Sequence, residues 1–236
     1  MNARFLSPRS RTWLPLALAA ATLTSTASAG DEEGGYVGTR DEGHTTVVYN
    51  FLKYFSWDQY YWCADSQWTW NNNNRVDDMD IAIFAGHGNQ WYFVGEDGDG
   101  VDLTSVGSGS DGGYGDVDCE FVAFQSCYVV PSPIEVSDWY TNWTQSSGVF
   151  EGLHQAIGFH TVSYQSTDQD VTNLFGIYTR WNFGVWSSWF AAINAEARSD
   201  EHGSAVMHPS TEDDRYYSFA ADPSPTSGSL RIWYQF

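Results

Sequence analysis

Two short apolar runs, each ending abruptly at a potentially reactive side chain, constrain the fold of this chain more than any other feature. One run, in DIAIFAGHG, stops at Gly86-His87-Gly88, and the other, in CEFVAFQSC, stops at Ser126-Cys127. Apolar runs of this length, bounded by polar residues and glycines, are typical of buried β-strands. We therefore expect buried strands over residues 79–85 and 121–125, followed at once by a histidine and a cysteine.

The rest of the sequence alternates strand-like and helix-like segments. Further strands are expected over residues 45–51, 91–94, 157–164 and 230–236. One or two helices are expected between residues 137 and 156, and a long helix over 171–197, in which Gly176 and Gly184 weaken the pattern. This alternation predicts an α/β domain with a mostly parallel central sheet.

The first 29 residues have the pattern of a signal peptide. Three arginines precede an apolar stretch over residues 13–23, and Ala27-Ser28-Ala29 fits the small-residue cleavage pattern. The apolar stretch is too short for a membrane-spanning helix, and no later stretch is long and apolar enough to replace it. We therefore expect residues 30–236 to form a single exported domain, secreted or in the cell envelope, without membrane insertion.

Charge excludes two classes of partner. Removing residues 1–29 would leave seven basic residues, with Lys53 the only lysine, against thirty acidic ones. Such a surface repels nucleic acid and anionic membranes, so neither is expected as a partner. The histidines lack the spacing of a zinc site, and no cofactor is expected. The acidic segments GEDGDGVD and SDGGYGDVD could supply oxygen ligands to a structural calcium ion.

The three cysteines cannot all be paired within one chain. Cys119 and Cys127 bracket the second apolar run, and eight steps along a strand separate them by roughly 26 Å, which is too far for a disulfide. Any bridge must therefore join Cys63 to one of the other two. Pairing Cys63 with Cys119 leaves Cys127 as a free thiol.

His87 and Cys127 could act together in catalysis. Sites in open α/β sheets form at the carboxyl ends of the strands, where both residues are expected. Groups just past the ends of adjacent strands, ~4.8 Å apart, can face one cleft. A thiolate is a nucleophile, and histidine is the usual acid or base near neutral pH. The backbone N–H groups of Gly88 and Cys127 could then stabilise an oxyanion. The alternative for each motif alone is a tight turn or a packed cysteine.

The order and spacing of the two motifs resemble those of the caspase, legumain and gingipain clan of cysteine peptidases. A longer pattern, which adds FEGLHQAIGF, looks closer still to an uncharacterised group of secreted proteins. The resemblance covers residues 78–159. It implies a three-layer caspase-like fold with helices on both faces of the sheet, His87 as general acid, Cys127 as nucleophile and Gly88 as an oxyanion donor.

The same resemblance suggests where a substrate pocket forms. In this clan the first pocket is built partly by residues after the strand that follows the nucleophile, which here is GFHTVSYQSTDQD. Asp168 or Asp170 could there pair with an arginine or lysine side chain of a peptide substrate. The alternative is a solvated loop. His154 could approach the cleft from a helix or lie at a helix–sheet interface.

Three functions follow from these motifs. The first is an exported cysteine hydrolase, an endopeptidase with a His87–Cys127 dyad acting on a peptide or protein. The second is a catalytically inactive caspase-like module whose twelve tryptophans and fourteen tyrosines form a surface that recognises peptide or glycan. The third is a metal-dependent hydrolase that combines His87 with Asp97, Asp99 or Asp102. The sequence sets no oligomeric state.

Overall fold

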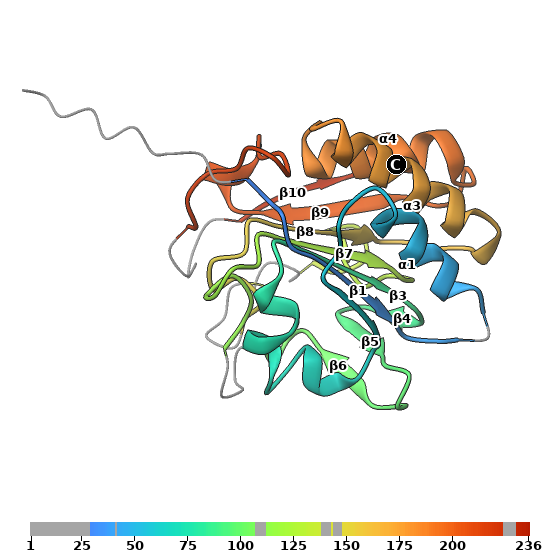
Figure 1. Cartoon of the computed structure of the whole chain (residues 1–236). Helices are drawn as coiled ribbons and strands as arrows, with labels where there is room; N and C mark the ends of the chain where they lie inside the picture. The colour runs from blue at the N-terminus through green and yellow to red at the C-terminus, as the bar shows by residue number, and fades with distance from the viewer. Residues whose placement is uncertain (1–28, 41, 107–111, 138–142, 144–147, 224–229) are drawn as a thin grey trace, which may run out of the picture.

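The computed structural model describes residues 29–40, 42–106, 112–137, 143, 148–223 and 230–236, and a seven-stranded sheet forms their centre (Figure 1). The strand order is β10-β9-β8-β7-β3-β1-β2. The strands are β1 (Glu33–Val37), β2 (Gln59–Trp62), β3 (Ile81–Ala85), β7 (Phe121–Gln125), β8 (Gln155–Phe159), β9 (Gly203–Met207) and β10 (Arg231–Tyr234). The first five are parallel, whereas β9 runs antiparallel to β8 and β10 antiparallel to β9. The expected α/β architecture with a mostly parallel sheet is confirmed.

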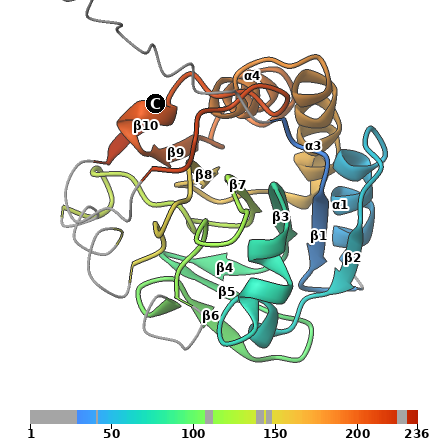
Figure 2. The same ribbon diagram turned by 60° about the vertical axis from the view of Figure 1, so that its left-hand side comes forward.

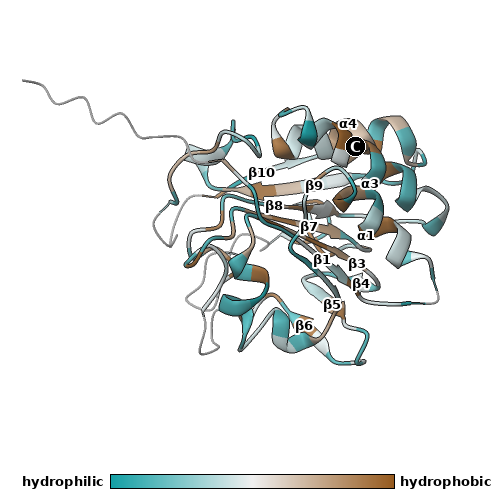
Figure 3. Cartoon of the chain, in the orientation of Figure 1, coloured by the Kyte–Doolittle hydropathy of each residue, from teal (hydrophilic) through white to brown (hydrophobic). Residues whose placement is uncertain are grey.

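One face of the sheet is covered by helices. They are α1 (His44–Leu52), α3 (Gln165–Arg180) and α4 (Val185–Glu196), which lie together on one side of the sheet in both ribbon views (Figures 1 and 2). Side chains alternate along each strand, so Ile81 and Ile83 of β3 pack in the same buried cluster as Phe51, Phe175 and Trp189 of the helices. Figure 3 shows the apolar colour concentrated on the central strands.

The opposite face is covered mainly by non-helical structure. It carries a second sheet of β4 (Gly88–Asn89), β5 (Tyr92–Val94) and β6 (Gly100–Asp102), and the 3₁₀ turns η1 (Asp65–Gln67), η2 (Asn72–Asn74) and η3 (Val76–Asp78). Trp68 is fully buried there, with its ring against Phe84, Phe93 and Phe124. Bulky aromatic side chains thus fill the space where a second helical layer was expected. All three α-helices with described bounds lie on the first face. On the second face, the helical structure among the described residues consists of the 3₁₀ turns and Trp143, which packs in the same cluster as Trp68, so helices on both faces stay a prediction.

Several expected elements differ from the structure. The expected strand over residues 45–51 is helix α1, because its buried residues Val47, Val48, Phe51 and Leu52 repeat at helical spacing. The expected long helix is two helices, which are separated by a turn where Asn182 has φ 61° and Gly184 precedes α4. Strands β1, β2, β4, β6 and β9 were not predicted, whereas β3, β5, β7 and β10 fall where strands were expected. β8 overlaps the expected strand over residues 157–164 only at residues 157–159.

Two expectations concern residues that the structure describes only in part. Residues 1–28 of the expected signal peptide lie outside the described residues. Of the expected helices between 137 and 156, residues 148–154 are not helical, and Trp143 is buried beside Phe150. Among the described residues, no helix has the length and apolar character needed to cross a membrane.

Candidate active site

A cleft of about 430 Å³ opens at the carboxyl ends of the parallel strands. The chain leaves β1 toward the helical face through α1, whereas it leaves β3 toward the small sheet, and a crevice between such strands is where ligands bind in open α/β sheets. The lining residues lie at or after the ends of β1, β3, β7 and β8: Glu42, His44, Gly86, His87, Gln125, Ser126, Cys127, Ser163, Gln165 and Asp168. The cleft therefore contains both halves of the expected dyad.

Strand register places His87 and Cys127 at equivalent positions. β3 and β7 are adjacent and parallel, with Ala85 opposite Gln125 at their ends. His87 and Cys127 each follow that pair by two residues, and both line the cleft. Their place in one cleft is a direct consequence of two apolar runs that end in register.

His87 is exposed and has one carboxylate partner. Its Nε2 lies 2.8 Å from Oε2 of Glu42, and 61% of its side chain is accessible to solvent. The ring of His44 packs edge-on against it, with 5.8 Å between ring centroids. Burial, with a smaller contribution from the neighbouring His87, lowers the pKa of His44. The sequence analysis missed Glu42 and His44, because their position depends on β1, which was not predicted.

The three cysteines have different environments. Cys127 is partly exposed, its thiol donates to the carbonyl of Ser163 at 3.6 Å, and its sulfur accepts from the Ser163 N–H at 3.4 Å. Cys63 and Cys119 are buried, and burial raises the pKa of both thiols. All three are free, so the expected Cys63–Cys119 disulfide is absent. Each buried thiol instead faces a carbonyl of its own segment, Cys63 that of Ala64 and Cys119 that of Phe121.

Gly88 permits close packing beside the dyad. A Cβ atom at this position would lie 2.5 Å from Oγ of Ser126 and 2.5 Å from a methyl group of Val129. The N–H of Val94 donates to the His87 carbonyl, which makes Gly88 and Phe93 a non-hydrogen-bonded pair of the β4–β5 ladder. The ladder therefore does not use the Gly88 N–H. Gly88 does not itself line the cleft, and its oxyanion role stays a prediction.

Asp168 lies in the cleft, whereas Asp170 does not. Asp168, in the first turn of α3, is 3% exposed, and its Oδ1 accepts hydrogen bonds from Nε2 of Gln125 and Oγ of Ser163, both at 2.6 Å. Burial raises the pKa of Asp168 to about 6, although these two hydrogen bonds oppose the shift. Asp170 is exposed on the same helix.

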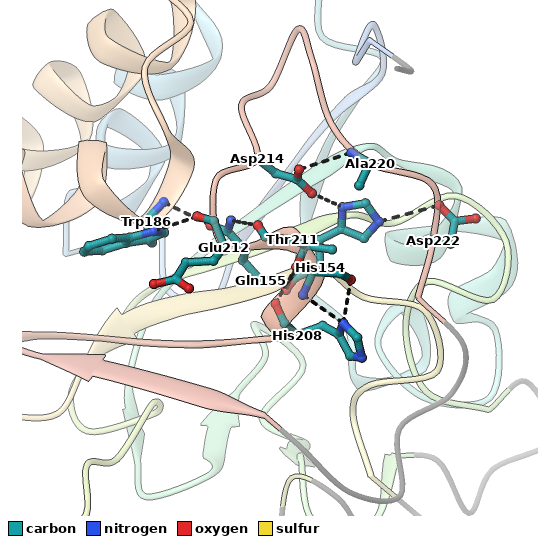
Figure 4. Close-up of polar contacts among 10 residues, drawn as sticks. His154, Gln155, Trp186, His208, Thr211, Glu212, Asp214, Ala220 and Asp222 are labelled. Carbon is teal, nitrogen blue, oxygen red and sulfur yellow. Dashed lines mark hydrogen bonds and ion pairs between the residues drawn. The ribbon is translucent and has the colours of Figure 1, made fainter. Parts of the chain in front are cut away.

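His154 is at the other end of the sheet. It precedes β8 and is fully buried, with Nδ1 2.7 Å from Oδ2 of Asp214 and Nε2 3.6 Å from Oδ1 of Asp222 (Figure 4). The cleft lies at the carboxyl ends of the strands, so His154 does not reach it. This corrects its expected place in the substrate pocket. The physical reason is that residues 151–154, just before β8, are irregular rather than helical.

Acidic side chains outside the cleft form one group with metal-ligand spacing among the described residues. Ligand oxygens of Asp65, Asp97 and Asp99 all lie within 4.8 Å of one another, and Asp97 and Asp99 belong to GEDGDGVD. His87 is in no such group within the described part of the chain, so nothing there brings it together with these acids. Asp102 accepts instead from the N–H and hydroxyl of Thr104. Structural calcium stays a prediction.

Sequence comparison places the chain in a family. The profile described as "Domain of unknown function (DUF6345)" matches residues 18–226, and the chain belongs to this family. A search of curated proteins found no match. The matched region contains all the residues that line the cleft.

Proposed function

We propose that this member of the DUF6345 family is an exported cysteine hydrolase, an endopeptidase with Cys127 as nucleophile and His87 as general acid–base. One observation carries the proposal: the two residues stand at equivalent positions past neighbouring parallel strands and line one cleft. The same arrangement supports a caspase-like fold, in which a histidine and a cysteine follow neighbouring strands of an α/β sheet.

The cleft residues suggest the steps of hydrolysis. His87 accepts the thiol proton, and the Cys127 sulfur bonds to the carbonyl carbon of the scissile peptide. The carbonyl oxygen gains negative charge, which the N–H groups of Gly88 and Cys127 stabilise. His87 then gives its proton to the leaving nitrogen as the C–N bond breaks, which leaves a thioester. Water, deprotonated by His87, attacks the thioester and releases the acid and the free thiol.

Glu42 is proposed to orient His87 during these steps. A carboxylate 2.8 Å from Nε2 fixes one ring nitrogen and leaves Nδ1 to face the substrate. It also stabilises the imidazolium that forms after proton transfer, as a carboxylate does for the histidine of a catalytic triad. The His44 ring limits rotation of the imidazole from a second side.

A second candidate is a binding module. A hollow of about 270 Å³ between α1 and β2 is lined by Thr45, Thr46, Tyr49, Trp57 and Tyr60. Tyr49 is 50% exposed and Trp57 is 38% exposed, so aromatic faces are available to a peptide or glycan. Binding there would need neither His87 nor Cys127.

Hydrolysis assays separate the two candidates. Residues 30–236 are incubated with unfolded protein substrates and a peptide library, alongside the Cys127→Ala and His87→Ala variants. The exposed Asp170→Asn variant serves as a matched control close to the cleft. The hydrolase proposal expects cleavage by wild type and control only. Equal cleavage by Cys127→Ala, or no cleavage together with peptide or glycan binding that Trp57→Ala removes, would contradict it.

A further inference from the structure

A second hollow lies beside the segments that carry the dyad. It has a volume of about 490 Å³ and is lined by Asn89, Gln90, Trp91 and Tyr128. Asn89 ends β4, and Gln90 and Trp91 form the turn into β5, on the face of the central sheet opposite the helices (Figure 1). Tyr128 directly follows the proposed nucleophile. The hollow is therefore built from the two stretches of chain that lead away from His87 and Cys127.

These two stretches of chain are in direct contact. Gly88 begins β4, and a Cβ atom there would lie 2.5 Å from both Oγ of Ser126 and a methyl group of Val129. The N–H of Tyr128 donates to the carbonyl of Thr161 at 3.0 Å, which ties the loop after the nucleophile to the chain just past β8. The position of the hollow beside the dyad is thus set by backbone packing.

Two aromatic side chains of the hollow are held in an unfavourable backbone conformation. Trp91 has φ 58° and Tyr128 has φ 60°, in the left-handed region that bulky residues rarely adopt. Such strain is concentrated at functional sites. Trp91 packs partly against the aromatic core of this face, and both side chains keep part of their surface accessible to solvent. A ligand in the hollow can therefore reach both rings.

The lining of the hollow is uncharged in a chain that has thirty acidic residues. Two aromatic residues and the exposed amides of Asn89 and Gln90 form it. A charged side chain placed there would lose hydration without gaining a counter-charge from the lining. A planar apolar ring can stack on Trp91 or Tyr128, and the amides can hydrogen-bond to a peptide backbone. These features favour a neutral aromatic side chain as the occupant.

We propose that the hollow binds an aromatic side chain on the leaving-group side of the scissile peptide bond. The inference rests on the proposed function for the place of that side chain in a substrate, but binding of the ring does not require catalysis. In the proposed mechanism His87 protonates the leaving nitrogen, so that nitrogen has to lie toward His87. The residues after it then run toward the hairpin that follows His87, where a side chain meets Trp91 and Tyr128. The preferred substrates are peptides with an aromatic residue shortly after the cleaved bond.

Binding without turnover tests the inference. The probe is phenylalanyl-glycinamide, whose amine stands for the leaving nitrogen, and its alanyl, lysyl and glutamyl counterparts are controls. Each is titrated into the ¹⁵N-labelled Cys127→Ala form of residues 30–236, and the indole N–H resonance of Trp91, assigned with Trp91→Phe, is followed. The phenylalanyl probe should shift this resonance with a Kd about fivefold or more below those of the controls. Equal affinities, tighter binding of the lysyl probe or no shift would overturn the inference.

Variants then locate the bound ring. In the same background Tyr128→Gly removes one aromatic wall and relieves the left-handed backbone, so it should fold and weaken probe binding about fivefold or more, whereas Tyr128→Phe should keep the binding. Trp57→Gly is the matched control, because Trp57 is an exposed aromatic residue with φ 33° that lines the hollow between α1 and β2. Unchanged binding in Tyr128→Gly, or an equal loss in Trp57→Gly, would overturn the inference.

The inference and the proposed function can fail separately. Probe binding at Trp91 together with no cleavage by wild type would contradict the hydrolase alone. Cleavage by wild type without probe binding, at sites that show no excess of aromatic residues after the cleaved bond, would contradict this inference alone. Mass spectrometry of the cleavage products of unfolded protein substrates gives the sites.

Discussion

The two ends of the central sheet each hold a histidine beside carboxylates, but they use it differently. At the amino end His154 is fully buried between Asp214 and Asp222, and the rings of Phe121 and Phe219 pack against it edge-on (Figure 4). At the carboxyl end His87 is mostly exposed and has one carboxylate neighbour in an open cleft. Identical residue types therefore mark a structural site at one end and a candidate reactive site at the other.

The carboxylates at the two ends of the sheet also lie in different environments. Register aligns the residues just before β1, β3 and β7, which places Glu32, Asp80 and Glu120 side by side. Asp80 accepts hydrogen bonds from the N–H groups of Asp31 and Glu32, so it fixes the backbone of the two residues before β1. Burial, then the charges of Asp80, Asp118 and Asp222, raise the pKa of Glu120 to about 10. In the cleft, by contrast, Asp168 keeps a carboxylate available near neutral pH.

The largest effect should come from removing the nucleophile. Cys127→Ala should lower kcat/KM by roughly 10⁴-fold or more, because no other group in the cleft can form the thioester. Its free energy of unfolding should change by less than about 1 kcal/mol, since the thiol is partly exposed. Peptide hydrolysis and urea unfolding measure the two. Retained activity in Cys127→Ala would contradict a catalytic role for Cys127 at the carboxyl end of the sheet.

The corresponding change at the amino end of the sheet is His154→Ala, which should affect stability rather than activity. It should cost about 3–5 kcal/mol of unfolding free energy, because it leaves the buried Asp214 carboxylate without its partner. At temperatures where the variant is folded, kcat/KM should match wild type. Urea unfolding with parallel hydrolysis assays checks both. A stable variant with lost activity would show that the amino end is the functional one.

The strands that could be predicted from the sequence differ in composition from those that could not. β3 and β7 were predictable because IAIFA and FVAFQ are continuous apolar runs. Their register then placed His87 and Cys127 at equivalent positions along one cleft. β1 is EGGYV and β9 is GSAVM. Their glycines and short side chains do not form the continuous apolar run by which a buried strand is recognised. Glu42 reaches His87 only because β1 pairs with β3, a contact that local pattern does not encode.

An intermediate effect is expected for Glu42→Gln. The amide still hydrogen-bonds to His87 but does not stabilise the imidazolium, so kcat should fall roughly 10- to 100-fold with little change in KM. Both partners are partly exposed, and stability should change by less than about 1 kcal/mol. Steady-state kinetics and a pH–rate profile test this. A profile and kcat equal to those of wild type would remove Glu42 from the proposed mechanism.

The smallest effect should be Glu120→Gln at the amino end. The folded-state pKa of Glu120, about 10, exceeds its ordinary value of 4.5, so this group stabilises the fold below pH 4.5 and that contribution is lost as pH rises toward 10. The amide does not titrate, so the variant should be more stable than wild type by about 1 kcal/mol at neutral pH. Thermal melts between pH 5 and 9 should show the advantage growing with pH. A constant or shrinking difference would contradict the burial of a carboxyl here.

The most direct test of the account is covalent labelling of the native protein. Residues 30–236 are treated with a panel of peptidyl chloromethyl ketones, and the modified cysteine is mapped by mass spectrometry. Cys127 should be alkylated, His87→Ala should slow that reaction at least tenfold, and the buried Cys63 and Cys119 should react only after unfolding. If Cys127 is unreactive in the native protein, or reacts equally fast without His87, the His87–Cys127 dyad is wrong.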